Sequence, residues 1–217
     1  MGAVAALGSL ANLAEAQGGL ITTRQAEARG VARRDLARLT SAGGLERVTH
    51  GVYRVGGAPR PRLLELRAAW LQLAPGLEAD SRVPEYGAVS HASATLVYQV
   101  GLLEPWRHEF TVPPPRRLRS RRDDVMIHSH PIPARDVIWL DQILVTTPTR
   151  MIADLCTTRA DGEHLAGVVL DLLDKHLADA DELAAALAPH ARGYGAKEED
   201  GHRFLSYLFA ISQGARG

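Results

Sequence analysis

The chain has 217 residues, of which 46% are hydrophobic and 23% are charged, and its formal net charge is zero. This composition excludes a collagen, a coiled-coil rod and a fully disordered chain, and it supplies enough apolar residues for one or two domains with a sizeable core. Cys156 is the single cysteine, which excludes an internal disulfide and a cysteine-rich zinc site and favours a reducing, cytoplasmic location.

The first thirty residues predict two helices joined by a short extended piece. Apolar residues at three- and four-residue spacing indicate a helix over residues 4–16, and residues 20–21 follow in an extended conformation. Thr22, with Gln25 three residues later, matches a capping box and begins a second helix. That helix is expected to be short, because Gly30 ends it.

A third helix and a hairpin complete this N-terminal unit. Residues 33–42 predict a helix that stops at two glycines, and the alternating pattern of residues 45–55 around Gly51 is typical of a hairpin. Helix, short helix, tight turn, helix and hairpin is the order of elements in a winged helix-turn-helix.

Pro59 and Pro61 mark the end of the N-terminal unit. Beyond them, helices are expected at residues 63–73, 90–100, 148–156, 162–177, 181–187 and 198–211, and short strands at 109–112, 125–129, 137–140 and 143–145. The predicted fold is therefore α+β. A winged helix-turn-helix domain in residues 1–60 is followed by a larger mixed α/β domain in residues 61–217 with a helical C-terminal part.

The zero net charge hides an uneven distribution of charge along the chain. Residues 1–60 contain eight arginines and four acidic residues, a net charge of +4, so the remaining residues carry −4. A basic head on an acidic body indicates phosphate contact at the N-terminal end and a different task in the larger domain.

The third predicted helix has a basic face and an apolar face. At 100° per residue, Arg33, Arg34 and Arg38 fall on one side, and Leu36 and Leu39 fall on the other. Arginine side chains that project from a recognition helix contact guanine or phosphate in the major groove. The alternative is a solvated basic face without a ligand, but the preceding turn and the following hairpin favour DNA contact.

The predicted hairpin carries Arg47, His50 and Arg54, which we expect to contact the DNA backbone beside the recognition helix. The alternative is an ordinary exposed hairpin, and Tyr53 is expected in the core at its base. With the residues that begin the second helix, the predicted DNA-binding residues are Thr22, Thr23, Arg24, Arg33, Arg34, Arg38, Arg47, His50 and Arg54.

A second basic segment follows three consecutive prolines in the larger domain. It consists of Arg116, Arg117, Arg119, Arg121 and Arg122. Two interpretations stay open: a solvated loop, or a second site for phosphate or for an acidic surface. Asp123 and Asp124 follow directly and are expected to neutralise part of its charge.

Two constellations suggest chemistry without completing a site. His128 and His130 lie on one face of a predicted strand, but the spacing places no third metal ligand near them, and Pro131 follows at once. Ser90 and His91 are adjacent on a helix and point about 100° apart, so Ser90 is interpreted as an N-cap rather than a nucleophile. We therefore expect no catalytic residue, no metal and no cofactor.

Several short strings carry a resemblance to a known family. They are Gly19-Leu20-Ile21-Thr22-Thr23-Arg24-Gln25-Ala26, Gly30-Val31, Leu36-Ala37-Arg38-Leu39, Gly44-Leu45-Glu46-Arg47-Val48 and, most specific, Gly51-Val52-Tyr53-Arg54. The chain resembles the AbiEi-type antitoxins, the regulator half of bacterial abortive-infection (type IV) toxin–antitoxin pairs. Two strings in the larger domain, around Ser90-His91-Ala92-Ser93-Ala94 and Val145-Thr146-Thr147-Pro148-Thr149-Arg150, look like signatures of the same family. One departure is Ala32, where a recognition helix usually has a Ser or Thr N-cap.

The resemblance implies a cytoplasmic repressor of its own operon that also counteracts a nucleotidyltransferase-type toxin. Its partners would be operator DNA and that toxin, with no membrane, because the longest uncharged segment is too polar and too short for a span. A ligand-responsive transcriptional regulator and a DNA-targeted enzyme such as a nuclease are the alternatives. The enzyme is disfavoured because the chain has no Glu-x-Lys pair for a nuclease metal, and Gly8-Ser9 lies far from Asp179-Ala180-Asp181.

Overall fold

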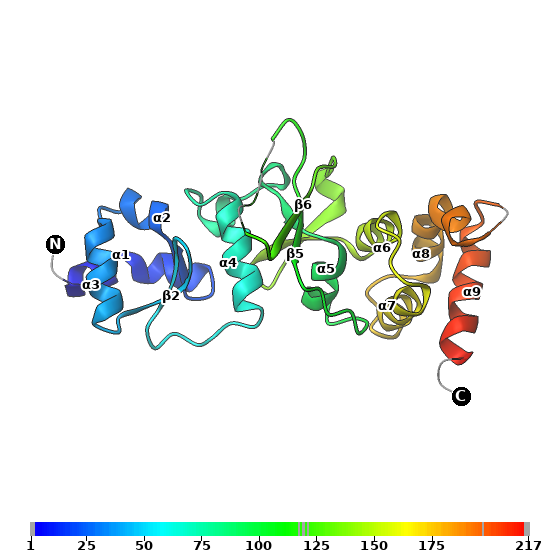
Figure 1. Cartoon of the computed structure of the whole chain (residues 1–217), viewed down its shortest axis with the longest axis horizontal. Coiled ribbons are helices and arrows are strands. Elements are labelled where there is room, and N and C mark those ends of the chain that lie inside the picture. Colours follow the sequence, from blue (N-terminus) through cyan, green and yellow to red (C-terminus); the bar gives the residue numbers. More distant parts are fainter. Residues whose placement is uncertain (1–2, 117, 119, 121, 197, 215–217) are drawn as a thin grey trace.

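The computed structural model describes residues 3–116, 118, 120, 122–196 and 198–214. Helices and strands are both abundant, which confirms the predicted α+β fold class. The chain forms an elongated molecule in which an N-terminal unit, a central sheet and a group of C-terminal helices follow one another along the long axis (Figure 1).

The N-terminal unit has the order of elements that the sequence predicts. It consists of α1 (Ala3–Ala16), β1 (Leu20–Thr22), α2 (Thr23–Ala28), α3 (Arg33–Ser41), β2 (Leu45–Thr49) and β3 (Val52–Val55). The extended piece before α2 joins the hairpin, so the wing is an antiparallel sheet of order β1-β3-β2. Gly30, with a φ of +78°, forms the turn between α2 and α3.

The N-terminal ends of α2 and α3 differ in how they are capped. Thr22 and Gln25 form the predicted capping box at the start of α2. Ala32 occupies the N-cap of α3 in an extended conformation and provides no side-chain hydrogen bond. The amide groups of the first turn of α3 therefore receive no side-chain cap from this position.

The central part of the chain is built on a mixed five-stranded sheet. Its elements are α4 (Leu64–Leu73), β4 (Ala88–Val89), α5 (His91–Tyr98), β5 (His108–Thr111), β6 (Val125–His128), β7 (Val137–Leu140), β8 (Ile143–Thr146) and α6 (Pro148–Thr157). The strand order is β6-β5-β4-β8-β7, with β5–β6 and β4–β8 parallel and the other pairs antiparallel. The central strand β4 has only two residues, too few for a periodic pattern, so the sequence did not predict it.

Three helices form the C-terminal end, and the first two of them pack against α6. They are α7 (Gly162–Asp174), α8 (Ala180–Leu187) and α9 (Gly201–Gly214), and α9 contacts both α7 and α8. A Cβ atom at Gly201 would lie 1.8 Å from the carbonyl oxygen of Ala184, so only glycine permits this close approach. Cys156 on α6 is buried.

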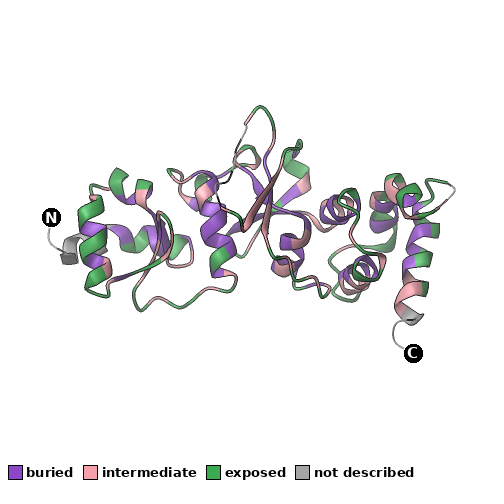
Figure 2. Ribbon diagram, viewed as in Figure 1, coloured by how far each residue is buried: buried purple, intermediate pink, exposed green. Residues whose placement is uncertain are grey.

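The helix α4 connects the N-terminal unit to the central sheet. Eight of its ten residues are buried, more than the one face that a surface helix buries (Figure 2). It contacts β1, β2 and β3 on one side and β5 on another. Leu20 and Val52 of the wing sheet accordingly belong to the same apolar core as Trp70 of α4. The two units are joined by packing, not only by the chain.

Within the described residues, no helix combines the length and the apolar character needed to cross a membrane.

The uncapped start of α3 predicts a stabilising substitution. Changing Ala32 to Ser supplies a hydroxyl at an extended N-cap position, and we expect the free energy of unfolding to rise by about 1 kcal/mol. The measurement is chemical denaturation followed by circular dichroism. Ala37→Ser, on the exposed face in the middle of the same helix, is the control and should give no gain. Equal stability of the Ala32→Ser variant and the parent chain would contradict this account of the helix start.

Candidate nucleic-acid interface

The three arginines that the helical spacing predicts on one face of α3 are all exposed. Leu36 and Leu39 are buried, whereas Arg33, Arg34 and Arg38 are exposed on the outer face of the N-terminal unit (Figure 2). The apolar and basic faces of α3 are therefore as predicted, and the basic face is directed away from the core.

The surroundings of these three arginines differ. The Nε of Arg33 lies 2.7 Å from a carboxylate oxygen of Glu27, and Arg38 forms an ion pair with Asp35 one turn earlier. The hydrogen bond from Arg38 lowers the pKa of Asp35. No ion pair to Arg34 occurs within the part of the chain that the structure describes. Arg34 therefore presents the charge of this helix that is least compensated.

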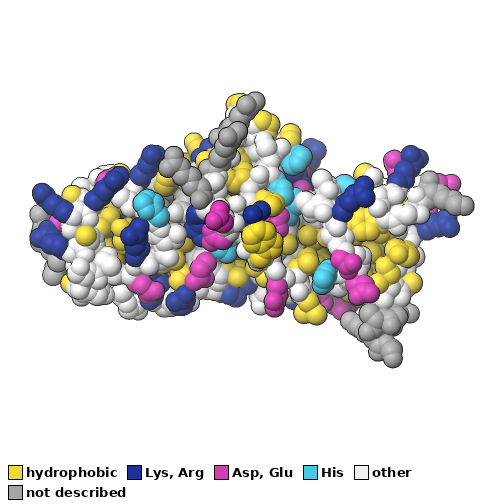
Figure 3. All heavy atoms as spheres, viewed as in Figure 1, with side chains coloured by type: hydrophobic (Ala, Val, Ile, Leu, Met, Phe, Trp, Pro, Cys, Tyr) yellow, Lys and Arg dark blue, Asp and Glu magenta, His cyan; other side chains and the backbone are white. Residues whose placement is uncertain are grey.

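A groove lies between the start of α2, the start of α3 and the wing. Its volume is about 400 Å³, and five predicted residues line it: Thr23, Arg24, Arg33, Arg47 and His50. Gly51, Tyr53, Gln72 and Pro75 complete its walls. Basic side chains gather over this end of the molecule (Figure 3). Residues from three separate elements thus converge on one basic concave surface.

Hydrogen bonds attach the wing both to α2 and to α4. The amide of Thr23 donates to the carbonyl of Gly51 at 2.9 Å, which fixes the tip of the wing beside α2. The Nε2 of Gln72 on α4 donates to the carbonyl of His50 at 2.7 Å. Arg47 reaches along the same hairpin to the ring of His50 at 3.1 Å. The groove is consequently formed by packed elements rather than by a free loop.

Thr22 has a structural role instead of a place on this surface. It is completely buried, and its hydroxyl accepts from the amide of Gln25 at 3.1 Å and donates to the carbonyl of Pro75. The Nε2 of Gln25 donates to the carbonyl of Leu77 at 2.6 Å, and Gln17 donates to the other side of Gln25. These contacts attach α2 to the segment after α4. Thr22 is therefore buried at this junction and is not exposed for the DNA contact predicted from the sequence.

Arg54 is also engaged within the chain. Its guanidinium lies 2.6 Å from Glu46 and donates to the carbonyl of Ala58, and its side chain is 15% exposed. The hydrogen bond from Arg54 to Glu46 lowers the pKa of Glu46. The predicted backbone contact by Arg54 would first require this ion pair to open.

The second basic segment is only partly described. Arg117, Arg119 and Arg121 lie outside the described residues. Arg116 donates to the carbonyls of Tyr86 and Leu73, and Arg122 binds Asp124 at 2.5 Å, as expected from the adjacent acidic pair. The two described arginines therefore stabilise the central fold.

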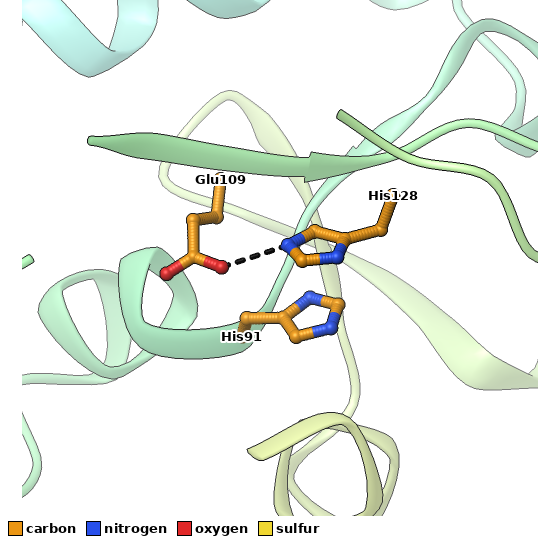
Figure 4. Close-up of side chains that lie close together, drawn as sticks. All are labelled: His91, Glu109 and His128. Carbon is orange, nitrogen blue, oxygen red and sulfur yellow. Dashed lines mark hydrogen bonds and ion pairs between the residues drawn. The ribbon is translucent and has the colours of Figure 1, made fainter. Parts of the chain in front are cut away.

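A cluster of polar side chains that was not predicted from the sequence lies at the start of α5. Ser90 occupies the N-cap position but forms no capping hydrogen bond, because its hydroxyl pairs with the ring of His91 at 2.9 Å and accepts from Thr111 at 2.8 Å. His128 stacks on His91 and bonds to Glu109 (Figure 4). The predicted cap at Ser90 was wrong, and His91 and Glu109, rather than His130, are the neighbours that surround His128.

The comparisons with known proteins bear on the N-terminal unit and on the fold. Residues 9–56 match the family model described as a transcriptional regulator, AbiEi antitoxin. The crystal structure of the RV2827C protein from Mycobacterium tuberculosis is similar in fold, with a TM-score of 0.53 and 18% identity over 94% of this chain and 75% of that chain. No curated protein matches the sequence. The matched segment contains all the predicted residues that line the groove.

The structural role of Thr22 can be separated from the surface role of its neighbour. Thr22→Val removes two buried hydrogen bonds without changing the shape of the side chain, so we expect the free energy of unfolding to fall by about 1–3 kcal/mol. Thr23→Val is the matched control, because the hydroxyl of Thr23 makes one long contact of 3.4 Å, and its stability should stay close to that of the parent chain. Equal losses in both variants would show that the buried bonds of Thr22 are not the cause.

Proposed function

We propose that this chain is the antitoxin of a toxin–antitoxin pair and that it represses its own operon by binding promoter DNA. The observation that carries the proposal is the basic groove, which lies within a segment matching an AbiEi antitoxin-type transcriptional regulator. In this proposal, the partner that the larger domain counteracts is a nucleotidyltransferase-type toxin, in the cytoplasm, and the chain acts by binding without a catalytic step.

The proposed DNA contacts follow from the geometry of the N-terminal unit. A helix such as α3 fits the major groove, where Arg34 and Arg38 would reach base edges or phosphates. Arg24, Arg33 and Arg47 line the concave surface beside it and are suited to the phosphate backbone. Because Arg33 and Arg38 already neighbour carboxylates, DNA binding would exchange an exposed ion pair for a phosphate contact.

A second candidate is a regulator that responds to a small ligand. It is favoured by a cavity of about 640 Å³ in the central part, lined by Tyr86, Arg116, Ile132 and five prolines. The neighbouring reading frame discriminates between the two candidates. A nucleotidyltransferase gene that abuts this one supports the antitoxin, and its absence supports the ligand-responsive regulator.

The first test concerns the groove. The triple variant Arg24→Gln/Arg33→Gln/Arg47→Gln should bind promoter DNA more weakly, and the dependence of log K on log salt should become shallower by about 2.7 if all three residues contact phosphate. Affinity is measured by fluorescence anisotropy at several salt concentrations. Arg135→Gln is the matched control, because Arg135 is 86% exposed and lies far along the chain from the groove. An unchanged salt slope in the triple variant would remove the groove from the interface.

The second test separates the two activities in the intact chain. Since α4 packs against the wing sheet, a truncated larger domain would expose apolar surface, so the groove variant is the cleaner tool. We expect the triple variant to lose repression of a promoter reporter and to keep its rescue of growth when the neighbouring toxin gene is expressed. Loss of rescue in a folded triple variant would show that toxin neutralisation also uses the groove.

A further inference from the structure

We infer that His91, Glu109 and His128 form a binding site for a divalent transition-metal ion, with Zn²⁺ as the preferred ion. The three residues each place one ligating atom within 4.8 Å of the other two (Figure 4). This site does not rest on the proposed DNA contacts, because it lies in the central sheet, away from the groove.

Three different elements deliver the ligands to one point. Glu109 lies on β5 and His128 on β6, and the parallel register pairs Glu109 with Met126 and Thr111 with His128. Side chains two positions apart share one face of a sheet, so Glu109, Thr111 and His128 project from the same face. His91 begins α5, which packs against β5, and therefore meets them from the adjoining layer.

The three ligating atoms are close enough together for one ion to lie between them. The Nε2 of His128 is 2.8 Å from a carboxylate oxygen of Glu109, and the two imidazole rings stack with centroids 3.6 Å apart. Ligand atoms on a tetrahedral zinc lie at about 2.0–2.2 Å from the ion and thus roughly 3.3 Å from one another. Because the two rings are stacked with an interplanar angle of 15°, binding requires the His128 ring to turn out of the stack and to exchange its hydrogen bond with Glu109 for the ion.

The surroundings prepare His91 for this role. Its Nδ1 pairs with Ser90 at 2.9 Å, and Ser90 is held in turn by Thr111, which is the kind of outer hydrogen bond that orients a ligating histidine. Among the described residues, no partner bonds to its Nε2, which leaves that nitrogen open.

The local charge is compatible with a cation. Arg150 is near the cluster, but its guanidinium is paired with Asp136 at 2.9 Å and with Asp154 at 2.8 Å. The second carboxylate oxygen of Asp154 is buried and has no hydrogen-bond partner in the described part of the chain. Two imidazoles with one carboxylate favour zinc over magnesium or calcium, which take oxygen ligands. Three protein ligands leave a fourth position for water.

The ion would attach the edge of the sheet to the helix above it. Among the described residues, β6 is an edge strand that pairs with β5 alone, and it carries one ligand of the three. Because the ligands come from α5, β5 and β6, bound metal should stabilise the folded chain and raise its thermal midpoint by about 5 °C or more at saturating concentration.

The test uses the full chain, freed of any affinity tag and of metal by dialysis against a chelator. Zn²⁺ is titrated in competition with a chromophoric chelator, and Co²⁺ is added separately to record its visible spectrum. We expect one Zn²⁺ per chain, the intense visible bands of four-coordinate Co²⁺, and a higher thermal midpoint. Absence of stoichiometric binding, or a Co²⁺ spectrum of the hydrated ion, would overturn the site.

Two variants test the ligands, and a third is the control. Glu109→Gln keeps a hydrogen-bond acceptor for His128 and His128→Asn keeps a polar side chain, and each should weaken Zn²⁺ binding about 100-fold or more. His164→Gln is the control, since His164 is half exposed on α7 and distant in the chain from the cluster, and it should bind as the parent does. Circular dichroism establishes that each variant is folded. Parent-like affinity in both folded ligand variants would show that Zn²⁺ binds elsewhere.

Discussion

The geometry of the basic groove depends on one buried joint between the N-terminal unit and the segment after α4. Thr22 and Gln25 form the capping box at the start of α2. The same two side chains also donate hydrogen bonds, Thr22 to the carbonyl of Pro75 and Gln25 to the carbonyl of Leu77. Both bonds would be lost if the two units separated, and each typically contributes about 1 kcal/mol, so they oppose separation. Arg29 adds a more exposed ion pair to Glu78 at 2.5 Å.

The position of the carbonyls in this joint is itself fixed from the larger unit. Arg82 is buried, and its guanidinium donates to the carbonyls of Trp70, Leu71 and Ala74 at the end of α4. These are the carbonyls that a helix leaves without partners at its C-terminal end. Burial lowers the pKa of Arg82 to about 9, which is the electrostatic cost of placing a cation there. The segment that receives Thr22 and Gln25 is thereby held in place.

Local signals in the sequence were sufficient for the N-terminal unit. The capping box at Thr22, the two faces of α3 and the hairpin around Gly51 depend on residues only a few positions apart, and the structure confirms all three. The burial of Thr22 could not be predicted in this way, since its second partner, Pro75, lies 53 positions away. The expected contact set therefore included one residue that belongs to the joint.

The central cluster escaped prediction for a related reason. His128 attracted attention through its spacing to His130, but the parallel pairing of β5 with β6 brings Glu109 beside it. Parallel pairing joins strands that are distant in the sequence, and no local pattern specifies it. Ser90 shows the same limit, because a serine before a helix predicts a cap unless a stronger long-range partner, here Thr111, is known.

The position of Gln72 and Pro75 in the wall of the groove connects events at the two ends of the molecule. Both residues belong to the larger unit, and Gln72 holds the wing through the carbonyl of His50. A partner that bound the larger unit and favoured this docked arrangement would therefore also favour the binding of a ligand in the groove. By thermodynamic reciprocity, the ligand strengthens the partner by the same factor. Any change in how the larger unit docks on the wing would thus also change the wall of the groove.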